Sequence, residues 1–266
     1  MKKFILSCIM VFSLILLWNG NNGVKEVKAA SDSYICTFSI KIGEVEYTTK
    51  YTDEKIYQNQ DNMYYEVCNL VQCENGKTTI IEKNVLNKFV SNGKLIYYSK
   101  IQEKTNIIYK YNLKTKKKEK ILSGKKVGVL GCSGKYLYYG KYNLGYHNSG
   151  MYADVYSCQL KNKKKMHMAE NIGWVKYYKG RVLLLGGKSD VSNSDVYLYK
   201  ENGKKIRKLS KSLGCVFKSK KIYCTICRYN GNYGTEFKVV RYSLDGKKEK
   251  TVVKWTKDNS RIRKYQ

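Results

Sequence analysis

Residues 92–100 read NGKLIYYSK, and residues 133–141 read SGKYLYYGK. Each segment is a turn of small and polar residues followed by an apolar, tyrosine-rich run, which is typical of a β-strand that leaves a tight turn. Weaker copies begin at Lys179 (KGRVLLLGGK) and Ser219 (SKKIYCTIC), and a variant begins at Asp61 (DNMYYEVCN). This self-similarity predicts a protein built from equivalent units.

A second repeated element is an alternating strand, a lysine-rich turn and another strand. It reads IIYKYNLKTKKKEKIL from Ile107, DVYSCQLKNKKKMHM from Asp154, DVYLYKENGKKIRKL from Asp195 and VVRYSLDGKKEKTVV from Val239, with a degenerate copy, LVQCENGKTTII, from Leu70. Anchored on Cys73, Tyr111, Cys158, Tyr199 and Tyr242, the element recurs after about 38, 47, 41 and 43 residues.

Two hairpins per repeat of about 42 residues give four strands, the period and strand count of a propeller blade. The predicted fold is therefore all-β, a β-propeller of about five four-stranded blades. A sixth blade, closed by pairing of the two termini, is an open alternative. Predicted blades are 44–85, 86–124, 125–170, 171–211 and 212–254, between an N-terminal strand segment (30–43) and a C-terminal tail (255–266). A sandwich and an open stack of β-meanders are the alternative architectures.

The pattern of a turn, two apolar residues, two tyrosines, a loop and a second hairpin resembles the low-density-lipoprotein-receptor-type and TolB-like β-propellers. It is most similar to the tyrosine-rich propellers of unknown function that Gram-positive gut bacteria secrete. Family propellers often have six blades, and the Tyr-Trp-Thr-Asp signature and the sialidase Asp-box are both missing from this sequence. The resemblance implies a scaffold for binding and fixes no reaction.

The N-terminus has the pattern of a cleavable secretory signal peptide at 1–29. Lys2 and Lys3 precede an apolar run from Phe4 to Trp18, and Val27-Lys28-Ala29 suits cleavage after Ala29. The run of roughly 15 residues is shorter than the ~20 that span a bilayer. An uncleaved anchor is the alternative. We expect the rest of the chain to be secreted or associated with the cell wall, and to meet the membrane only during export.

The chain is strongly basic, with a net charge of +30. Four lysines and one glutamate leave with residues 1–29, so the mature chain carries about +27. Outside the cell such a charge favours anionic cell-wall polymers, glycans or extracellular proteins as partners rather than nucleic acid. Compositional drift toward lysine is the alternative explanation.

Eight cysteines remain after residue 29, an even number that permits disulfides in an exported protein. Cys224 and Cys227 lie on one predicted strand, too far apart and on opposite faces, so they are not expected to bond to each other. Most of the cysteines are expected to pack as small apolar side chains. No metal site and no cofactor are predicted, because the sequence has only two histidines, His147 and His167, and no second ligand pair.

Antiparallel strands place the four loops of a blade alternately on two faces of a propeller. One face collects the lysine-rich turns and is the candidate polyanion-binding surface. Its predicted residues are Lys116, Lys117, Lys118, Lys163, Lys164, Lys165, Lys204, Lys205, Lys247 and Lys248. Ordinary solvated turns are the alternative explanation for this surface.

The opposite face carries longer loops rich in Tyr, Asn, Ser and Gly, a composition that suits recognition of sugars or proteins. The candidate ligand-binding residues there are Tyr142, Tyr146, His147, Asn148, Tyr152, Tyr229, Asn230, Asn232 and Tyr233. Loops that are polar only because they face solvent would look the same.

Familiar catalytic motifs are missing, including the G-x-S-x-G, H-E-x-x-H and P-loop patterns. His147 with Cys132 and Asp154 is a poor triad candidate, and no catalytic residue is predicted. The expected function is therefore a secreted, non-catalytic binding or scaffold protein for a glycan, wall polymer or protein. An envelope assembly factor that binds only proteins is one alternative. The other is a propeller-type polysaccharide hydrolase that uses the loop carboxylates Asp154, Asp190, Asp195 and Glu236.

Overall fold

The protein is described from a computed structural model, which covers residues 25–26, 35–57, 64–102, 105–142, 153–186, 193–229 and 234–265. Its elements in chain order are β1 (Lys25–Glu26), β2 (Ile35–Thr37), β3 (Ser39–Ile42), β4 (Val45–Tyr57), β5 (Tyr64–Glu74), β6 (Lys77–Ser91), β7 (Leu95–Lys100), β8 (Asn106–Asn112), β9 (Lys118–Gly124), β10 (Val127–Cys132), β11 (Tyr136–Tyr142), β12 (Ala153–Gln159), β13 (Lys165–Tyr178), β14 (Arg181–Gly186), β15 (Asp195–Lys200), β16 (Lys205–Lys208), β17 (Gly214–Lys218), β18 (Lys221–Tyr229), β19 (Thr235–Tyr242), β20 (Lys248–Thr256) and α2 (Ser260–Arg263).

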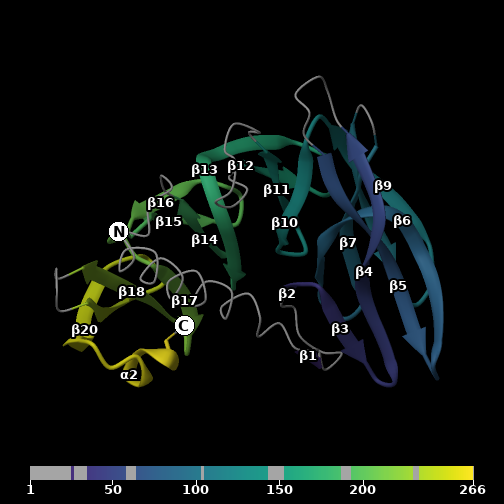
Figure 1. Ribbon diagram of the computed structural model, residues 1–266. Helices are drawn as coiled ribbons and strands as arrows, with labels where there is room; N and C mark the ends of the chain where they lie inside the picture. The colour runs from purple at the N-terminus through teal and green to yellow at the C-terminus, as the bar shows by residue number, and fades with distance from the viewer. Residues whose placement is uncertain are drawn as a thin grey trace.

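These strands form five four-stranded antiparallel blades that follow one another around an arc (Figure 1). Blade 1 is β3, β4, β5 and the first half of β6; blade 2 is the second half of β6 with β7, β8 and β9. Blade 3 is β10, β11, β12 and the first half of β13; blade 4 is the second half of β13 with β14, β15 and β16. Blade 5 is β17 to β20. The predicted all-β propeller of about five blades is confirmed.

Two long strands join blades without a loop. The first half of β6 pairs with β5 and its second half with β7, and β13 links β12 to β14 in the same way. At each crossing an asparagine has a left-handed backbone, with φ of 58° at Asn84 and 53° at Asn171. Asparagine tolerates this conformation better than most residues, which explains how the strand turns there into the next blade.

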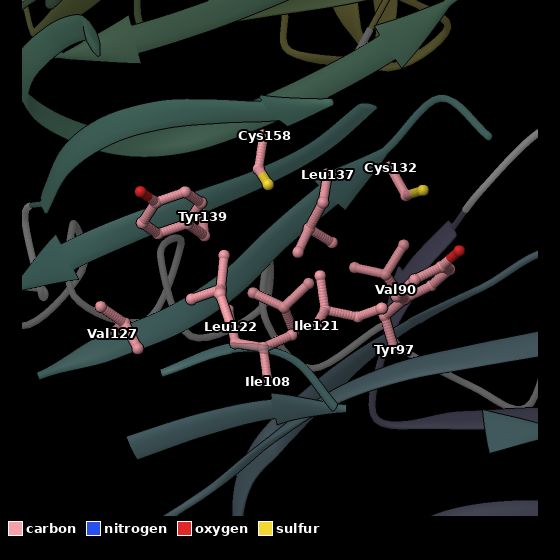
Figure 2. Packing of buried hydrophobic residues seen from close by; sticks show 11 residues of the cluster. Val90, Tyr97, Ile108, Ile121, Leu122, Val127, Cys132, Leu137, Tyr139 and Cys158 are labelled. Carbon is pink, nitrogen blue, oxygen red and sulfur yellow. The ribbon is translucent and has the colours of Figure 1, made fainter. Parts of the chain in front are cut away.

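The hydrophobic core is divided into clusters between adjacent blades, because each pleated sheet buries its apolar residues against its neighbour. Figure 2 shows the cluster between blades 2 and 3, in which Ile108 and Leu122 lie against Val127 and Leu137. Similar clusters lie between blades 1 and 2, 3 and 4, and 4 and 5. Tyr97, Tyr98 and Tyr138 are among the largest fully buried side chains, so tyrosine is a core residue here as well as a surface one.

The two flanks of the arc differ in composition. The outer face of blade 5 is apolar, and Ile262 of α2 covers it by packing with Phe237 and Val253. The outer face of blade 1 is mixed, since Glu46 and Thr48 of β4 lie there opposite Cys73 and the buried Val71 of β5. The described residues show no pairing between the two termini, so they do not form the sixth blade that the sequence left open.

The N-terminal segment contributes to the blades themselves. β3, which lies within the predicted segment 30–43, is the innermost strand of blade 1, and β2 pairs with the inner edge of β6 in blade 2. β1 pairs in parallel with β3 but precedes Ala29, so cleavage after that residue would remove it. The sequence repeat does not reveal β3 as a blade strand, because a strand of four residues is too short to show a period.

One disulfide joins Cys215 of β17 to Cys224 of β18, which face each other across the hairpin. Cys227 is a buried thiol on the other face of β18, as the strand geometry predicts. Cys68, Cys132 and Cys158 are fully buried in the clusters between blades, as expected for small apolar side chains. In Figure 2, Leu137 lies between the sulfur atoms of Cys132 and Cys158.

Candidate polyanion-binding face

Each blade presents two tight turns at one end of the propeller. The inner turn joins its first and second strands and the outer turn joins its third and fourth; we call the surface they make the turn face. In blades 2, 3 and 4 the two turns are hydrogen-bonded together, because the amides of Leu113, Leu160 and Glu201 donate to the carbonyls of Lys94, Lys135 and Gly180 at 3.0, 2.9 and 3.1 Å. The lysines of both turns therefore lie on one continuous surface.

One lysine occupies the same backbone position in the outer turns of blades 2 to 5. The carbonyls of Lys117, Lys164, Lys204 and Lys247 accept a hydrogen bond from the amide that opens the turn, at Asn112, Gln159, Lys200 and Ser243 respectively, over 2.8–3.0 Å. We call these four the tip lysines. All four are exposed, and Lys117, Lys164 and Lys204 have no side-chain partner among the described residues.

The residue before each tip lysine has a left-handed backbone. In blades 4 and 5 it is glycine, with φ of 87° at Gly203 and 82° at Gly246, whereas in blades 2 and 3 it is Lys116 (57°) and Lys163 (60°). A residue with a Cβ loses about 1 kcal/mol in this conformation. Contacts with the preceding blade offset that loss, since Lys116 Nζ lies 3.2 Å from Gln72 Oε1 and Lys163 Nζ lies 3.5 Å from Glu119 Oε1.

Of the remaining lysines of the predicted surface, some are held by a neighbouring side chain and others are exposed without such a partner. Lys118 forms an ion pair with Glu82 at 3.1 Å, and Lys205 lies over the Tyr197 ring with Nζ 4.4 Å from its centroid. Lys165 and Lys248 are exposed, with no side-chain partner in the described part of the chain. The ten predicted lysines thus share one face, but only some of them are available to a ligand.

Acidic residues are few in these turns and concentrate on blade 1. Glu44 lies in its inner turn and Glu74 in its outer turn, and together with Glu46 they line a pocket at that corner. Elsewhere on the turn face the described turns carry only Glu201 and Asp245. The field of the turn face is therefore positive over blades 2 to 5 and weaker over blade 1.

Just outside the turns, the Glu119 carboxylate holds two lysines, Lys110 and Lys163. A hydrogen bond from Lys110, together with the positive charges of Lys110 and Lys163, holds the pKa of Glu119 below its usual value even though partial burial acts in the opposite direction. Glu119 therefore stays ionised and keeps Lys163 directed toward blade 2.

The opposite end of the propeller, which we call the loop face, is described only in part. Seven of its predicted ligand residues lie outside the described residues: Tyr146, His147, Asn148, Tyr152, Asn230, Asn232 and Tyr233. Tyr142 is half-buried against Val67, Leu86 and Ile101, so its ring contributes to packing. Tyr229 is 73% exposed.

An aromatic residue beside Tyr229 was not predictable from the loop pattern. Trp255 of β20 lies under the Arg228 guanidinium, whose carbon is 4.3 Å from the ring centroid, and Arg228 pairs with Glu236 at 2.8 Å. Trp255 belongs to the C-terminal tail that the sequence predicts, and only the pairing of β20 with β19 brings it to this corner of blade 5.

The residues weighed for catalysis are not brought together. Cys132 pairs with the first half of β11 at Leu137, whereas Asp154 pairs with its other end at Lys141, so the two lie at opposite ends of blade 3. Asp195 is paired with Lys208 at 2.8 Å. His147 and Asp190 lie outside the described residues.

His167 is exposed on β13 and contacts the Tyr156 ring. Among the residues that the structure covers, no group of three or more His, Cys, Asp or Glu side chains has the arrangement of a metal site. No helix in the same residues is long and apolar enough to cross a membrane.

No protein-family model matches the sequence, and no curated protein matches it. Among solved structures, an acylaminoacyl peptidase in complex with Z-Gly-Gly-Phe-chloromethyl ketone is similar, with a TM-score of 0.52 and 14% identity over 85% of this chain and 41% of that chain. TolB from Acinetobacter baumannii (TM-score 0.39, 13% identity, 77% and 50% of the two chains) and the β-propeller domain of the Trilobed protease from Pyrococcus furiosus (0.33, 15%, 85% and 85%) also match.

The chain is therefore a β-propeller, and it spans about two fifths of the length of the peptidase that it matches. At such low identity the likeness concerns the fold alone. Function has to be argued from this chain's own surfaces.

Proposed function

We propose that this protein is an exported, non-catalytic binding propeller whose turn face holds an anionic polymer outside the cell. The observation that carries the proposal is the repetition of an exposed lysine at the same backbone position in four consecutive blades, Lys117, Lys164, Lys204 and Lys247. A solvated turn needs polar residues but does not need a positive charge at one fixed position, so chance drift explains the repetition less well.

Binding is favoured over catalysis because two of the four carboxylates weighed for a hydrolase are engaged in ion pairs. Lys208 holds Asp195, and Arg228 holds Glu236. A general acid or base must exchange its proton with a substrate, whereas these two groups are held in ion pairs with cations. The signal-like segment 1–29 supports an extracellular site of action, where an anionic cell-wall polymer is the partner that the charge fits.

The test is binding of the mature chain, residues 30–266, to isolated cell wall and to purified poly(glycerol phosphate), at low salt and again in concentrated salt. Because exposed charges are screened within ~8 Å at physiological ionic strength, binding through the turn face should weaken strongly as salt rises. The triple variant Lys117→Gln/Lys164→Gln/Lys204→Gln should bind at least tenfold more weakly.

A matched control removes the same number of charges from the opposite end of the propeller. Lys83, Lys125 and Lys211 are exposed near the junctions between blades on the loop face. Their triple change to Gln should leave binding within about twofold of the unchanged chain. Equal losses in both triple variants would mean that net charge alone drives adsorption, and the proposal would be wrong.

The exposed corner of blade 5 supports a second candidate function, recognition of a glycan or a protein on the loop face. Tyr229 is 73% exposed beside Arg228 and Trp255, a combination of aromatic surface and charge that suits such contacts. Under this proposal Tyr229→Ala abolishes binding to one glycan class on an array, and that binding resists salt. Binding that is unchanged by Tyr229→Ala would rule this candidate out.

A further inference from the structure

We infer that the ligand of the turn face is a flexible, linear phosphate polymer that runs along the arc of the propeller and contacts one tip lysine in each of blades 2 to 5. This inference rests on the proposed function. It adds which lysines contact the ligand and to which chemical class the ligand belongs. It begins from the backbone, because the same hydrogen bond fixes Lys117, Lys164, Lys204 and Lys247 at equivalent places. Their Cα atoms are therefore related by the rotation from blade to blade.

The neighbouring lysines are not available in every blade: Lys165 and Lys248 are exposed without a side-chain partner, but Lys205, which also follows a tip lysine, lies over the Tyr197 ring. Lys116 and Lys163 extend toward the preceding blade, and Lys118 is paired with Glu82. The tip lysines are free of such contacts except at Lys247, whose Nζ lies 3.8 Å from Asp245 Oδ2 in a largely exposed pair. An exposed pair of this kind contributes little, so a stronger anion can replace Asp245.

Blade 1 has an outer turn at the same place as blades 2 to 5, but the electrostatic field around this turn is less positive. Lys77 closes its outer turn opposite Glu74, and Glu44 of the inner turn lines the same corner. Glu44, Glu46 and Glu74 outnumber Lys41 and Lys77 at this corner, which weakens its attraction for an anion. The line of tip lysines along the arc, which we call the track, therefore begins at blade 2. Lys77 is a matched control for the tip lysines.

The choice of side chain fits the phosphate groups of a flexible polymer. Lysine binds phosphate as a compact point charge that accepts variable orientations, whereas arginine suits fixed, bidentate pairing with a carboxylate or a phosphate. Arg181, the single arginine of the described turns of this face, is not available. Its Nε donates to the Leu244 carbonyl at 2.9 Å and its Nη1 donates to the Gly180 carbonyl at 3.2 Å.

The spacing sets a minimum length for the ligand. Packed sheets lie about 10 Å apart, so a chain that touches four consecutive blades must extend at least about 30 Å. A shorter oligomer reaches only one or two tip lysines and loses the gain in effective concentration that linked contacts provide. Affinity should therefore rise steeply with polymer length until four contacts form and change little afterwards.

The experiment measures anisotropy of fluorescent polyphosphate of graded lengths with the mature chain over a range of salt concentrations. Each phosphate contact to a flexible strand contributes about −0.7 to the slope of log K against log salt, so four contacts predict a slope of about −3. Single changes Lys117→Gln, Lys164→Gln and Lys204→Gln should each reduce its magnitude by about 0.7. Lys77→Gln should leave it unchanged.

Further outcomes separate this inference from the proposed function. The track is overturned if changes to the tip lysines leave the slope of log K against log salt unaltered, or if Lys77→Gln reduces that slope as much as they do. Such a result would leave a basic face that binds anions without ordered contacts. Equal affinity for polyglutamate or for vesicles with anionic lipid overturns the phosphate-polymer class. An absence of binding to every polyanion at low salt overturns the proposed function together with the inference. Matching thermal unfolding of each variant shows that the change is in binding and not in folding.

Discussion

The Glu82 carboxylate joins blade 1 to blade 2 through three donors. It accepts hydrogen bonds from Lys100 Nζ at 2.8 Å, Tyr98 Oη at 3.0 Å and Lys118 Nζ at 3.1 Å, and its side chain is only 12% exposed. Burial alone would raise the pKa of this carboxyl, but the hydrogen bonds from Lys100, Lys118 and Tyr98 outweigh burial and hold the pKa below its usual value. The ionised carboxylate is thus stabilised by folding.

We expect Glu82→Gln to lower the free energy of unfolding by about 2 kcal/mol at neutral pH, because two lysines lose their counter-charge near a buried site. Since the folded pKa is depressed, the stabilisation is present above the unfolded pKa of about 4.3 and is lost as pH falls through the folded value. Urea titrations of both proteins from neutral to acid pH should therefore converge. A pH-independent difference would contradict this explanation, and Glu119→Gln, in an exposed pair, should change stability by less than about 1 kcal/mol.

Two glycines with similar backbones lie in different surroundings. Gly203 (φ 87°) lies against blade 3, where an added Cβ would collide with Met166 Cε and lie 2.8 Å from Ser157 Oγ, whereas Gly180 (φ 75°) has open space. Gly180→Ala should destabilise by about 1 kcal/mol from the left-handed backbone alone. Gly203→Ala should destabilise by about 2 kcal/mol or more, because crowding is added. Equal urea midpoints for the two variants would mean that the outer turn of blade 4 does not pack on blade 3.

At the scale of elements, α2 has four residues and is too short to be stable alone, so packing must hold it in place. Ile262 is 1% exposed among Phe237, Val239 and Val253, and Tyr265 stacks on Tyr223 at 5.0 Å. Ile262→Ala should destabilise by about 2–4 kcal/mol and expose the outer face of blade 5 to an apolar dye. Arg261→Ala, an exposed change on the same helix, should stay within about 0.5 kcal/mol.

The first hairpin of blade 5 is closed by the disulfide between Cys215 and Cys224. In the chain-entropy model a loop of this length stabilises the fold by about 2–3 kcal/mol. Reductant should lower the urea midpoint accordingly, and the Cys215→Ala/Cys224→Ala variant should have a low midpoint with or without reductant. Cys227→Ser should keep the response to reductant, since Cys227 is a thiol. A midpoint that ignores reductant in the unchanged chain would contradict the pairing.

The hairpins were predictable from sequence because their turns and alternating strands repeat, and the sorting of lysines onto one face followed from strand direction alone. The side-chain contacts of each lysine were not predictable. Lys116 and Lys117 are adjacent and chemically identical, yet Lys116 extends to Gln72 of blade 1 and Lys117 does not, because the left-handed backbone at Lys116 redirects the chain. The disulfide pairing was equally hidden, since eight cysteines allow about 105 combinations.

At the scale of the whole molecule, the blades form a succession of apolar interfaces that ends at two different surfaces. Blades 2 to 4 have apolar residues on both faces, and blade 5 has its outer face covered by α2. Blade 1 has one apolar face, which holds Tyr47 and Leu70, and one mixed face, on which Glu46 and Lys50 lie beside Val71. A ring closed by packing blade 1 on blade 5 would bury lysine and glutamate against apolar side chains, at a large desolvation penalty.

The open arc can be tested by placing one charge on each kind of blade face. Thr48 is half-buried on the outer face of blade 1, whereas Leu137 lies on the equivalent strand of blade 3, fully buried against blade 2. Thr48→Lys should lower the free energy of unfolding by only about 1 kcal/mol, because it removes the hydrogen bond that the Thr48 hydroxyl donates to the Phe38 carbonyl at 3.1 Å. Leu137→Lys should reduce it by more than about 4 kcal/mol, because the charge enters an apolar interface without a partner.

The comparison bears directly on how the propeller is held together. Similar small effects at both sites would mean that the interfaces between blades are loosely packed, which the full burial of Leu137 and Tyr138 argues against. A large loss at Thr48 would mean that blade 1 is covered in solution, by ring closure or by a second copy, and sedimentation of the unchanged chain would separate those two cases. A loss of only about 1 kcal/mol at Thr48, together with unfolding at Leu137, is the result that an arc held by four interfaces requires.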